Sequence, residues 1–207
     1  MPKPNVLVVA GAKDHPQYAR DGAHLTLSLT AAGFQATQTA DPGELKKLLA
    51  GPYKVVVLYT FGDYLHDDDI DALVEFVRDG NGVVGVHSAI ATNPSSEALG
   101  NLFGARIIKG FIGEHDVTVS DPAHPLAKGI KPFHMDDELY VTKKQSDYKP
   151  FLATQYEGAS HPMAWSRTEG HGRVVYLANG HTPGGLTHPT FKDLLARSVE
   201  YVGEVRP

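Results

Sequence analysis

The fold of this chain can be inferred from one stretch, Val83-Val84-Gly85-Val86-His87-Ser88-Ala89. Its apolar residues predict a buried strand, and the residues that follow predict a sharp turn. In many α/β enzymes such a turn presents a nucleophilic serine or cysteine above the carboxyl edge of a parallel sheet. Here His87 occupies the tip of the turn, and the chain contains no cysteine. Covalent catalysis by a thiolate is therefore excluded.

Ser88 is the other polar residue of this turn. It stands one residue after the tip, and this offset points its side chain toward a different part of the turn. We therefore interpret Ser88 mainly as a helix cap, and keep a hydrolase with Ser88 as its nucleophile as a weaker alternative. His87 has two open interpretations: a functional group at a strand end, where α/β sheets bind ligands, or a buried structural side chain.

Segments typical of strands and helices alternate through the first half of the chain. Strands are expected at residues 6–10, 34–39, 55–59 and 83–86, and helices at 18–32, 42–49 and 67–79, the last with Gly80 beyond its end. The three aspartates at 67–69 indicate a solvated helix N-terminus rather than a metal site. This alternation predicts a parallel sheet whose two faces are covered by helices.

The second half of the chain is richer in turns. A short strand is expected at 116–119, and strand-like segments at 163–166 and 173–177 flank a turn and predict a β-hairpin. A final helix is expected at 189–202. No linker rich in proline, glycine or serine divides the chain, so we expect a single domain over residues 1–207.

The composition favours a small molecule as the partner. The formal net charge of −5 comes from acids and bases mixed along the 207 residues, which argues against binding to nucleic acid or to a membrane. The apolar run at 6–10 is too short to cross a bilayer and precedes no typical cleavage site, so we expect a cytoplasmic protein. A nucleotide cofactor is not expected, because there is no glycine-rich phosphate loop. The oligomeric state is open, and a homo-oligomer is one option.

The residues that could carry chemistry are dispersed along the chain. None of the 11 histidines has the spacing of a helical metalloprotease motif. The candidates are His87, His115, Glu138 in the acidic stretch 136–138, and His181. Each of them borders a predicted strand end, where a doubly wound sheet gathers its loops. We therefore expect these four side chains to meet in one cleft.

Two kinds of chemistry fit these candidates. Imidazoles beside a carboxylate can transfer protons near neutral pH, and His87, His115, Glu138 and His181 can equally bind a divalent metal such as zinc. Each residue also has a structural alternative: His115 pairs with Asp116, the acids form an exposed turn, or His181 caps a loop. The sequence spacing leaves these alternatives open.

Six blocks of the chain share their order and spacing with a known family. The earlier blocks are Lys109-Gly110-Phe111-Ile112-Gly113-Glu114-His115, Asp121-Pro122-Ala123-His124-Pro125-Leu126-Ala127-Lys128-Gly129 and Asp136-Asp137-Glu138-Leu139-Tyr140. The later blocks are Pro162-Met163-Ala164-Trp165, Gly172-Arg173-Val174-Val175-Tyr176 and Asn179-Gly180-His181. Together they resemble the ThuA-like (trehalose utilization) family. The stretch 85–89 also resembles the turn in which that family has histidine where class I glutamine amidotransferases have cysteine. The N-terminal segment Gly11-Ala12-Lys13-Asp14-His15 departs from the family's Gly-Gly-Phe-His opening.

This resemblance implies both a fold and a function. The implied fold is α/β and class I glutamine amidotransferase-like, a flavodoxin-like three-layer sandwich with a mainly parallel central sheet, to which the C-terminal β-hairpin region is added. The implied function is an enzyme of sugar metabolism, a lyase, hydrolase or isomerase that acts on trehalose-like or 3-keto-glycoside substrates without glutaminase activity. His87, Glu138 and His181 would be catalytic, and Ser88, Asp137 and Tyr140 would contact the substrate. The competing interpretation is a non-catalytic sugar-binding or regulatory module on the same scaffold.

Overall fold

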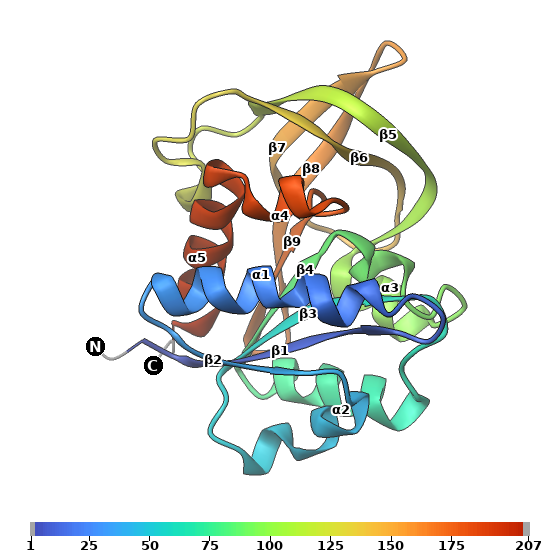
Figure 1. Ribbon diagram of the computed structural model, residues 1–207, viewed down its shortest axis with the longest axis vertical. Helices are drawn as coiled ribbons and strands as arrows, with labels where there is room; N and C mark the ends of the chain where they lie inside the picture. Colours follow the sequence, from blue (N-terminus) through green and yellow to red (C-terminus); the bar gives the residue numbers. More distant parts are fainter. Residues whose placement is uncertain (1–2, 205–207) are drawn as a thin grey trace.

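The computed structural model describes residues 3–204, whose strands form one nine-stranded sheet in the order β2-β1-β3-β4-β9-β8-β7-β5-β6 (Figure 1). One half of the sheet is parallel and contains β1 (Asn5–Ala12), β2 (Gln35–Thr39), β3 (Val55–Phe61), β4 (Gly82–Val86) and β9 (Gly172–Leu177). Residues 6–10 and 55–58 of β1 and β3 are at most 2% exposed. Such continuous apolar runs are typical of parallel strands that are covered on both faces.

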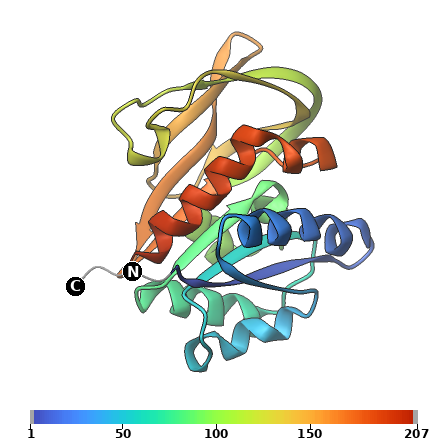
Figure 2. The ribbon, with the colours of Figure 1, turned by 60° about the vertical axis from the view of Figure 1, so that its left-hand side comes forward.

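Helices cover both faces of this parallel half (Figures 1 and 2). One layer contains α1 (Gln17–Ala31), α4 (Pro183–Thr187) and α5 (Pro189–Gly203), and the other contains α2 (Asp67–Arg78), α3 (Glu97–Phe103) and the 3₁₀ helix η1 (Pro42–Ala50). The predicted helices at 18–32, 67–79 and 189–202 are confirmed. Within residues 3–204, none of the helices has the length and apolar character that crossing a membrane would require.

The three aspartates at 67–69 lie in the first turn of α2. Asp67 and Asp68 are exposed, as expected for a solvated helix N-terminus. Asp69 is instead buried, and its Oδ2 accepts a hydrogen bond from the backbone N–H of His66 at 2.9 Å. This side chain satisfies one of the backbone groups at the start of the helix.

The prediction of a mainly parallel sheet is wrong for the other half of the molecule. There β5 (Ala105–Val119), β6 (Phe133–Lys144), β7 (Lys149–Tyr156) and β8 (Ala159–Glu169) pair in antiparallel fashion, so that four strand pairings are parallel and four are antiparallel. The long strands β5 and β6 mix polar with apolar residues because much of their surface meets solvent. Only the short apolar parts near 116–119 and 163–166 were therefore recognisable as strands.

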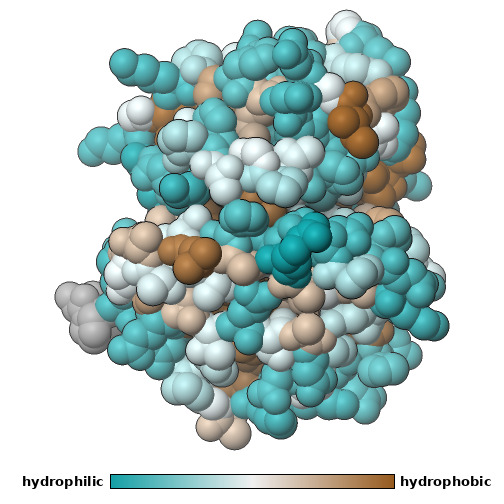
Figure 3. All heavy atoms as spheres, viewed as in Figure 1, coloured by the Kyte–Doolittle hydropathy of each residue, from teal (hydrophilic) through white to brown (hydrophobic). Residues whose placement is uncertain are grey.

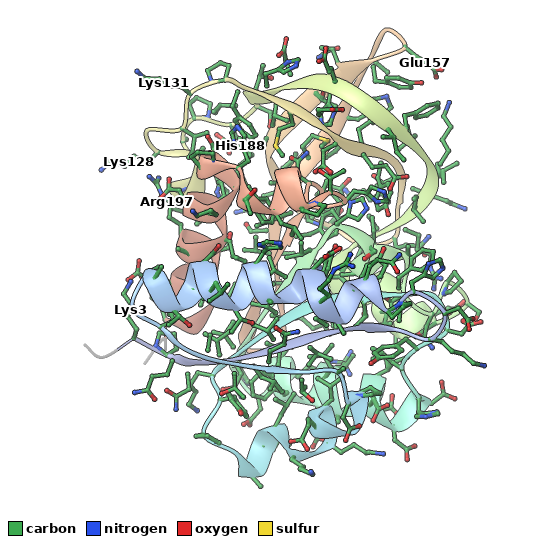
Figure 4. All side chains as sticks on the ribbon, in the orientation of Figure 1. Lys3, Lys128, Lys131, Glu157, His188 and Arg197 are labelled. Atoms are coloured by element: carbon green, nitrogen blue, oxygen red, sulfur yellow. The ribbon has the colours of Figure 1, made fainter. Side chains whose placement is uncertain are left out.

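The antiparallel half extends the sheet away from the N-terminal strand. Glu157 lies at the turn between β7 and β8, at the top of Figure 4, whereas Lys3 lies lower, at the left-hand side of the molecule. The predicted hairpin is confirmed, because β8 and β9 are antiparallel with Ser166 opposite Val175. It is also continuous with the parallel half, since β9 pairs with β4. The hairpin is therefore part of the central sheet rather than an addition to it.

The turn predicted around His87 is confirmed, and we refer to residues 86–88 as the elbow. Strand β4 ends at Val86, and the 3₁₀ helix η2 (His87–Ala91) begins at once. His87 has a positive φ of 45°, which costs an L-residue of this kind strain energy. The elbow lies at the carboxyl end of β4, between β3 and β9 in the sheet. This edge is where open α/β sheets bind ligands.

Candidate functional site

Three side chains from different parts of the chain meet at this edge of the sheet. His87 comes from the elbow, Glu138 from the middle of β6, and His181 from the loop between β9 and α4. Glu138 Oε2 lies 2.9 Å from His181 Nδ1 and 3.2 Å from His87 Nε2, and the two nitrogens are 3.1 Å apart. We refer to these residues as the His87–Glu138–His181 cluster.

His87 is held in one orientation by three contacts. Its Nδ1 lies 2.8 Å from the carbonyl oxygen of Ala178, and because a carbonyl only accepts, Nδ1 must carry the hydrogen. The hydroxyl of Tyr176 donates to the carbonyl of His87 at 2.6 Å, and the ring of Tyr140 stacks on the imidazole at a centroid distance of 4.3 Å. These contacts direct Nε2 toward Glu138 and His181.

Glu138 reaches the cluster because a glycine of the neighbouring strand β5, Gly110, leaves room for its side chain. A Cβ atom added to Gly110 would lie 2.0 Å from Glu138 Oε1 and 3.2 Å from Cε1 of Tyr140. Gly110 is directly opposite Tyr140 in the β5–β6 pairing. A glycine at this place therefore lets the carboxylate lie against the backbone of β5.

Hydrogen bonds within the cluster favour the ionised form of Glu138 and the protonated form of His181. Burial raises the pKa of Glu138, but hydrogen bonds to His181 and His87 outweigh burial and lower that pKa to about 2. The pKa of His181 is raised above its usual value of 6.5, chiefly by its hydrogen bond to Glu138. Glu138 is thus an anion at neutral pH, and His181 favours the form in which Nδ1 donates to it.

The three side chains differ in their access to solvent. The exposed fraction of the side chain is 0% for His87, 17% for Glu138 and 35% for His181. A ligand that arrives from solvent therefore meets His181 first, with Glu138 and His87 behind it. The Nδ1 edge of the His181 ring is engaged with Glu138, which leaves the Nε2 edge for a ligand.

His115 does not join this cluster. Its Nδ1 donates to the carbonyl of Gly113 at 3.0 Å, and its Nε2 accepts from the side-chain amide of Asn179 at 3.2 Å. Both ring nitrogens of this imidazole, which is 8% exposed, are therefore engaged in hydrogen bonds. Asp116, the alternative partner, is instead 2.9 Å from His134 Nδ1. Of the four side chains expected to meet in one cleft, three form the cluster, and His115 is bound to Asn179, in the segment that leads to His181.

The three residues expected to contact a substrate are all buried. Ser88 lies inside η2 and has no hydrogen-bond partner for its Oγ within residues 3–204, so its interpretation as a helix cap is wrong. Asp137 is 0% exposed and binds backbone N–H groups of the loop that carries His181. Tyr140 is 3% exposed and packs on His87, and burial raises the pKa of its hydroxyl.

Several residues that shape the cluster were not identified from the sequence. Ala178 and Tyr176 orient His87, and Gly110 makes room for Glu138. Gly110 carried no usable signal, because a glycine marks a close approach only inside a strand, and the strand around it was not recognisable from the sequence. The roles of the other two depend on pairing between distant segments.

The cluster also has the composition of a divalent metal site. Among residues 3–204, His87, Glu138 and His181 form a group of three side chains whose ligand atoms lie close enough to share one ion. Ligand atoms at 2.0–2.2 Å from a common ion lie about 2.8–3.6 Å from one another, depending on the coordination geometry, and the separations of 2.9–3.2 Å in the cluster fall in this range. The hydrogen bond from His87 Nδ1 to a backbone carbonyl is typical of metal-binding histidines as well.

Comparison with solved structures shows the same fold in other proteins. A ThuA-like protein from Parabacteroides merdae has a TM-score of 0.84 at 18% identity, covering 99% of this chain and 92% of that chain. A cytoplasmic protein from Salmonella typhimurium LT2 has a TM-score of 0.73 at 10% identity, covering 96% of this chain and 99% of that chain. A β-galactosidase from Bacillus circulans sp. alkalophilus has a TM-score of 0.70 at 14% identity, covering 99% of this chain but 32% of that chain.

The sequence comparisons identify the family directly. No curated protein sequence matches this chain. The family ThuA, described as trehalose utilisation, matches over residues 5–202, a range that includes the elbow, β6 and the loop of His181. The chain therefore belongs to the ThuA family.

Proposed function

We propose that this protein is an enzyme of disaccharide metabolism in which His181 transfers protons to and from a trehalose-like or 3-keto-glycoside substrate. The observation that carries this proposal is the 2.9 Å contact between His181 Nδ1 and Glu138 Oε2 on a partly exposed ring. A carboxylate behind one ring nitrogen fixes the tautomer and leaves the other nitrogen for the substrate.

The cluster divides the chemical work among its members. His181 acts as the general acid and base at its Nε2, and Glu138 orients the ring and stabilises its protonated form. His87 is fully buried, so it supports Glu138 and His181 rather than touching the sugar. In a 3-keto-glycoside, the carbonyl acidifies the neighbouring C–H, so a base can remove that proton and an acid can protonate the departing glycosidic oxygen.

The class of substrate follows from the family and from the surface. The ThuA family is described as trehalose utilisation, and the face drawn in Figure 3 is mainly hydrophilic with separate apolar patches. These features suit a small polar ligand. In this proposal the protein acts in the cytoplasm, as a monomer or as a homo-oligomer. Lyase, hydrolase and isomerase reactions on keto-sugars are all compatible with an acid and base of this kind.

The direct test is turnover of trehalose, 3-ketotrehalose and simple 3-keto-glycosides, followed by NMR of the products. His181→Gln and Glu138→Gln should lower kcat by at least about 100-fold, the usual contribution of general acid–base catalysis. His134→Gln is the matched control, because His134 also pairs with a carboxylate, Asp116, but on an exposed surface of the β5–β6 pair. If His181→Gln and Glu138→Gln keep the same activity as His134→Gln and the unmodified protein, the assignment of His181 is contradicted.

The second candidate function is a non-catalytic sugar-binding or regulatory module. The match to about a third of a β-galactosidase favours it, because the fold also occurs as a part of a larger protein. This candidate predicts that the protein binds a sugar and leaves it unchanged. Calorimetric binding of a disaccharide together with no product after prolonged incubation would select the module over the enzyme.

A metal-assisted form of the reaction is tested separately. Elemental analysis of the purified protein and titration with Co²⁺ would report whether the cluster binds a divalent ion. Two imidazoles and a carboxylate suit zinc or a related metal. If it does, His87→Gln should abolish the visible spectrum of Co²⁺ while His115→Gln should retain it. Such an ion would supply Lewis-acid chemistry at the sugar carbonyl.

A further inference from the structure

The carboxylate of Asp137 is the most enclosed charge beside the cluster. Its side chain is 0% exposed, and it makes no ion pair with a lysine, arginine or histidine within residues 3–204. It accepts three backbone hydrogen bonds instead: from Gly180 at 2.6 Å, and from His181 and Thr182 at 3.0 Å each. Burial of an ionised carboxylate is costly unless such donors surround it. All three donors belong to the loop that carries His181.

The position of Asp137 in β6 couples this loop to the cluster. Asp137 precedes Glu138, and neighbouring residues of a strand point to opposite faces. Asp137 binds the backbone of the His181 loop, and Glu138 binds the His181 ring. The bonds of Asp137 fix the position of the His181 backbone, and the bond of Glu138 fixes the direction in which His181 Nδ1 points.

The surrounding backbone leaves space for the Asp137 carboxylate and for little else. A Cβ atom added to Gly185, in α4, would lie 2.5 Å from Asp137 Oδ2 and 2.9 Å from its Oδ1. Real Cβ atoms do not approach so closely, so an alanine there must displace either the carboxylate or the loop. The absence of a side chain at Gly185 is thus part of the same arrangement.

We propose that Asp137 is a positioning residue that holds the backbone of residues 180–182 so that His181 faces Glu138, and that it does not contact the substrate. An asparagine at this position would turn an N–H₂ group toward backbone donors, and at least one buried donor would lose its acceptor. The loop would then shift, and His181 Nδ1 would lose its contact with Glu138. The effect on catalysis rests on the proposed function, whereas the effect on the His181 ring does not.

The test is ¹⁵N NMR of the histidine side chains in Asp137→Asn and Gly185→Ala, with the signal of His181 assigned from His181→Gln. In the unmodified protein, the ¹⁵N chemical shifts of the two ring nitrogens of His181 should be those of a ring whose Nδ1 is protonated and hydrogen-bonded. Both variants should move these resonances toward those of a free imidazole, while those of His124 stay unchanged. The matched control is Asp41→Asn, since Asp41 also accepts a backbone N–H, from Gly43, but on the exposed start of η1.

Activity on whichever 3-keto-glycoside is turned over provides the second measurement. A positioning role predicts that Asp137→Asn lowers kcat by about 10-fold or more and changes KM by less than about 2-fold. Unchanged His181 resonances in both variants, or a rise in KM with kcat preserved, would overturn the proposal. If Asp137→Asn does not fold, Gly185→Ala decides alone. Shifted resonances without turnover in any form of the protein would reject the proposed function and retain the positioning role.

Discussion

The backbone of His87 shows where this protein stores strain. A φ of 45° is unusual for a residue other than glycine, and such conformations cost about 1–3 kcal/mol. The bonds to Ala178 and from Tyr176, together with the stacked ring of Tyr140, compensate for this cost. Strain of this kind persists where the surrounding structure over-determines it, which is common at functional sites.

The ion pair between Glu138 and His181 should make stability depend on pH in a specific window. The pKa of Glu138 is lowered from 4.5 to about 2, so its contribution is complete above pH 4.5 and is lost as pH falls toward 2. The pKa of His181 is raised from 6.5, so its contribution is complete below pH 6.5 and is lost as pH rises through the raised value. Urea unfolding should therefore show Glu138→Gln to be less stable by about 1–3 kcal/mol near pH 5–6. A difference that is the same at pH 3, 5.5 and 9 would contradict this coupling.

Gly110→Ala should displace Glu138 without changing any charge. The added methyl would lie 2.0 Å from Glu138 Oε1, and overpacking of this kind costs about 1–3 kcal/mol. We expect lower stability in chemical denaturation and loss of turnover together. Gly184→Ala is the control, because its nearest contact would be an ordinary 3.6 Å to Thr182 Oγ1. Wild-type values of both quantities in Gly110→Ala would show that the carboxylate can lie elsewhere.

At the scale of elements, the antiparallel strands carry both the site and its support. Strand β6 contributes Glu138 to the cluster and Asp137 to the His181 loop, while β5 contributes Gly110. Further from the site, Trp165 of β8 donates to the carbonyl of Phe103 in α3 at 2.7 Å. The antiparallel half is therefore tied to the helices of the parallel half, and its strands bring residues to the carboxyl edge of the parallel strands.

The 3₁₀ helix η3 (Pro125–Ala127) depends on a histidine that must stay neutral. The backbone N–H of Leu126 donates to His124 Nδ1 at 3.2 Å, so Nε2 carries the hydrogen and donates to Ser166 Oγ at 2.7 Å. Burial lowers the pKa of His124 below 6.5. The unfolded chain then binds the proton more tightly, and stability falls as pH drops through 6.5 toward the lowered value.

Unfolding measured at pH 7.5 and 5.5 tests this element. The unmodified protein should lose up to about 1 kcal/mol more than His124→Gln over that interval, because only the former has this imidazole to protonate. Comparing the two proteins cancels the titration of the other histidines. An identical pH dependence would show that His124 accepts a second proton without disturbing η3.

At the scale of the whole molecule, an elbow without a cysteine predicts that glutaminase activity is absent. The chain has no cysteine, and Ser88 lies inside η2 with its side chain fully buried. Release of ammonia from glutamine should therefore stay at the rate of a blank without protein. Ammonia release that disappears in Ser88→Ala would reverse this conclusion.

The sequence by itself determined the parallel half of the fold, the elbow, the hairpin and the final helix. These features depend on continuous apolar runs, helical periodicity and turn residues, which act over a few neighbours along the chain. The same local signals placed His87 at a strand end and made Glu138 and His181 candidates, and the family resemblance implied their catalytic roles. No local pattern indicated that Glu138 would stand in the middle of a 12-residue strand.

Only the tertiary structure decided which polar residues meet. The register of β5 with β6 places Gly110 opposite Tyr140 and lets Glu138 reach His181. It also leaves His115 with Asn179, outside the cluster. The role of Asp137 depends on backbone N–H groups more than 40 residues away in the chain. Pairing between distant strands and the direction of loop amides are set by packing of the whole sheet, because no short stretch of sequence contains both partners of these contacts.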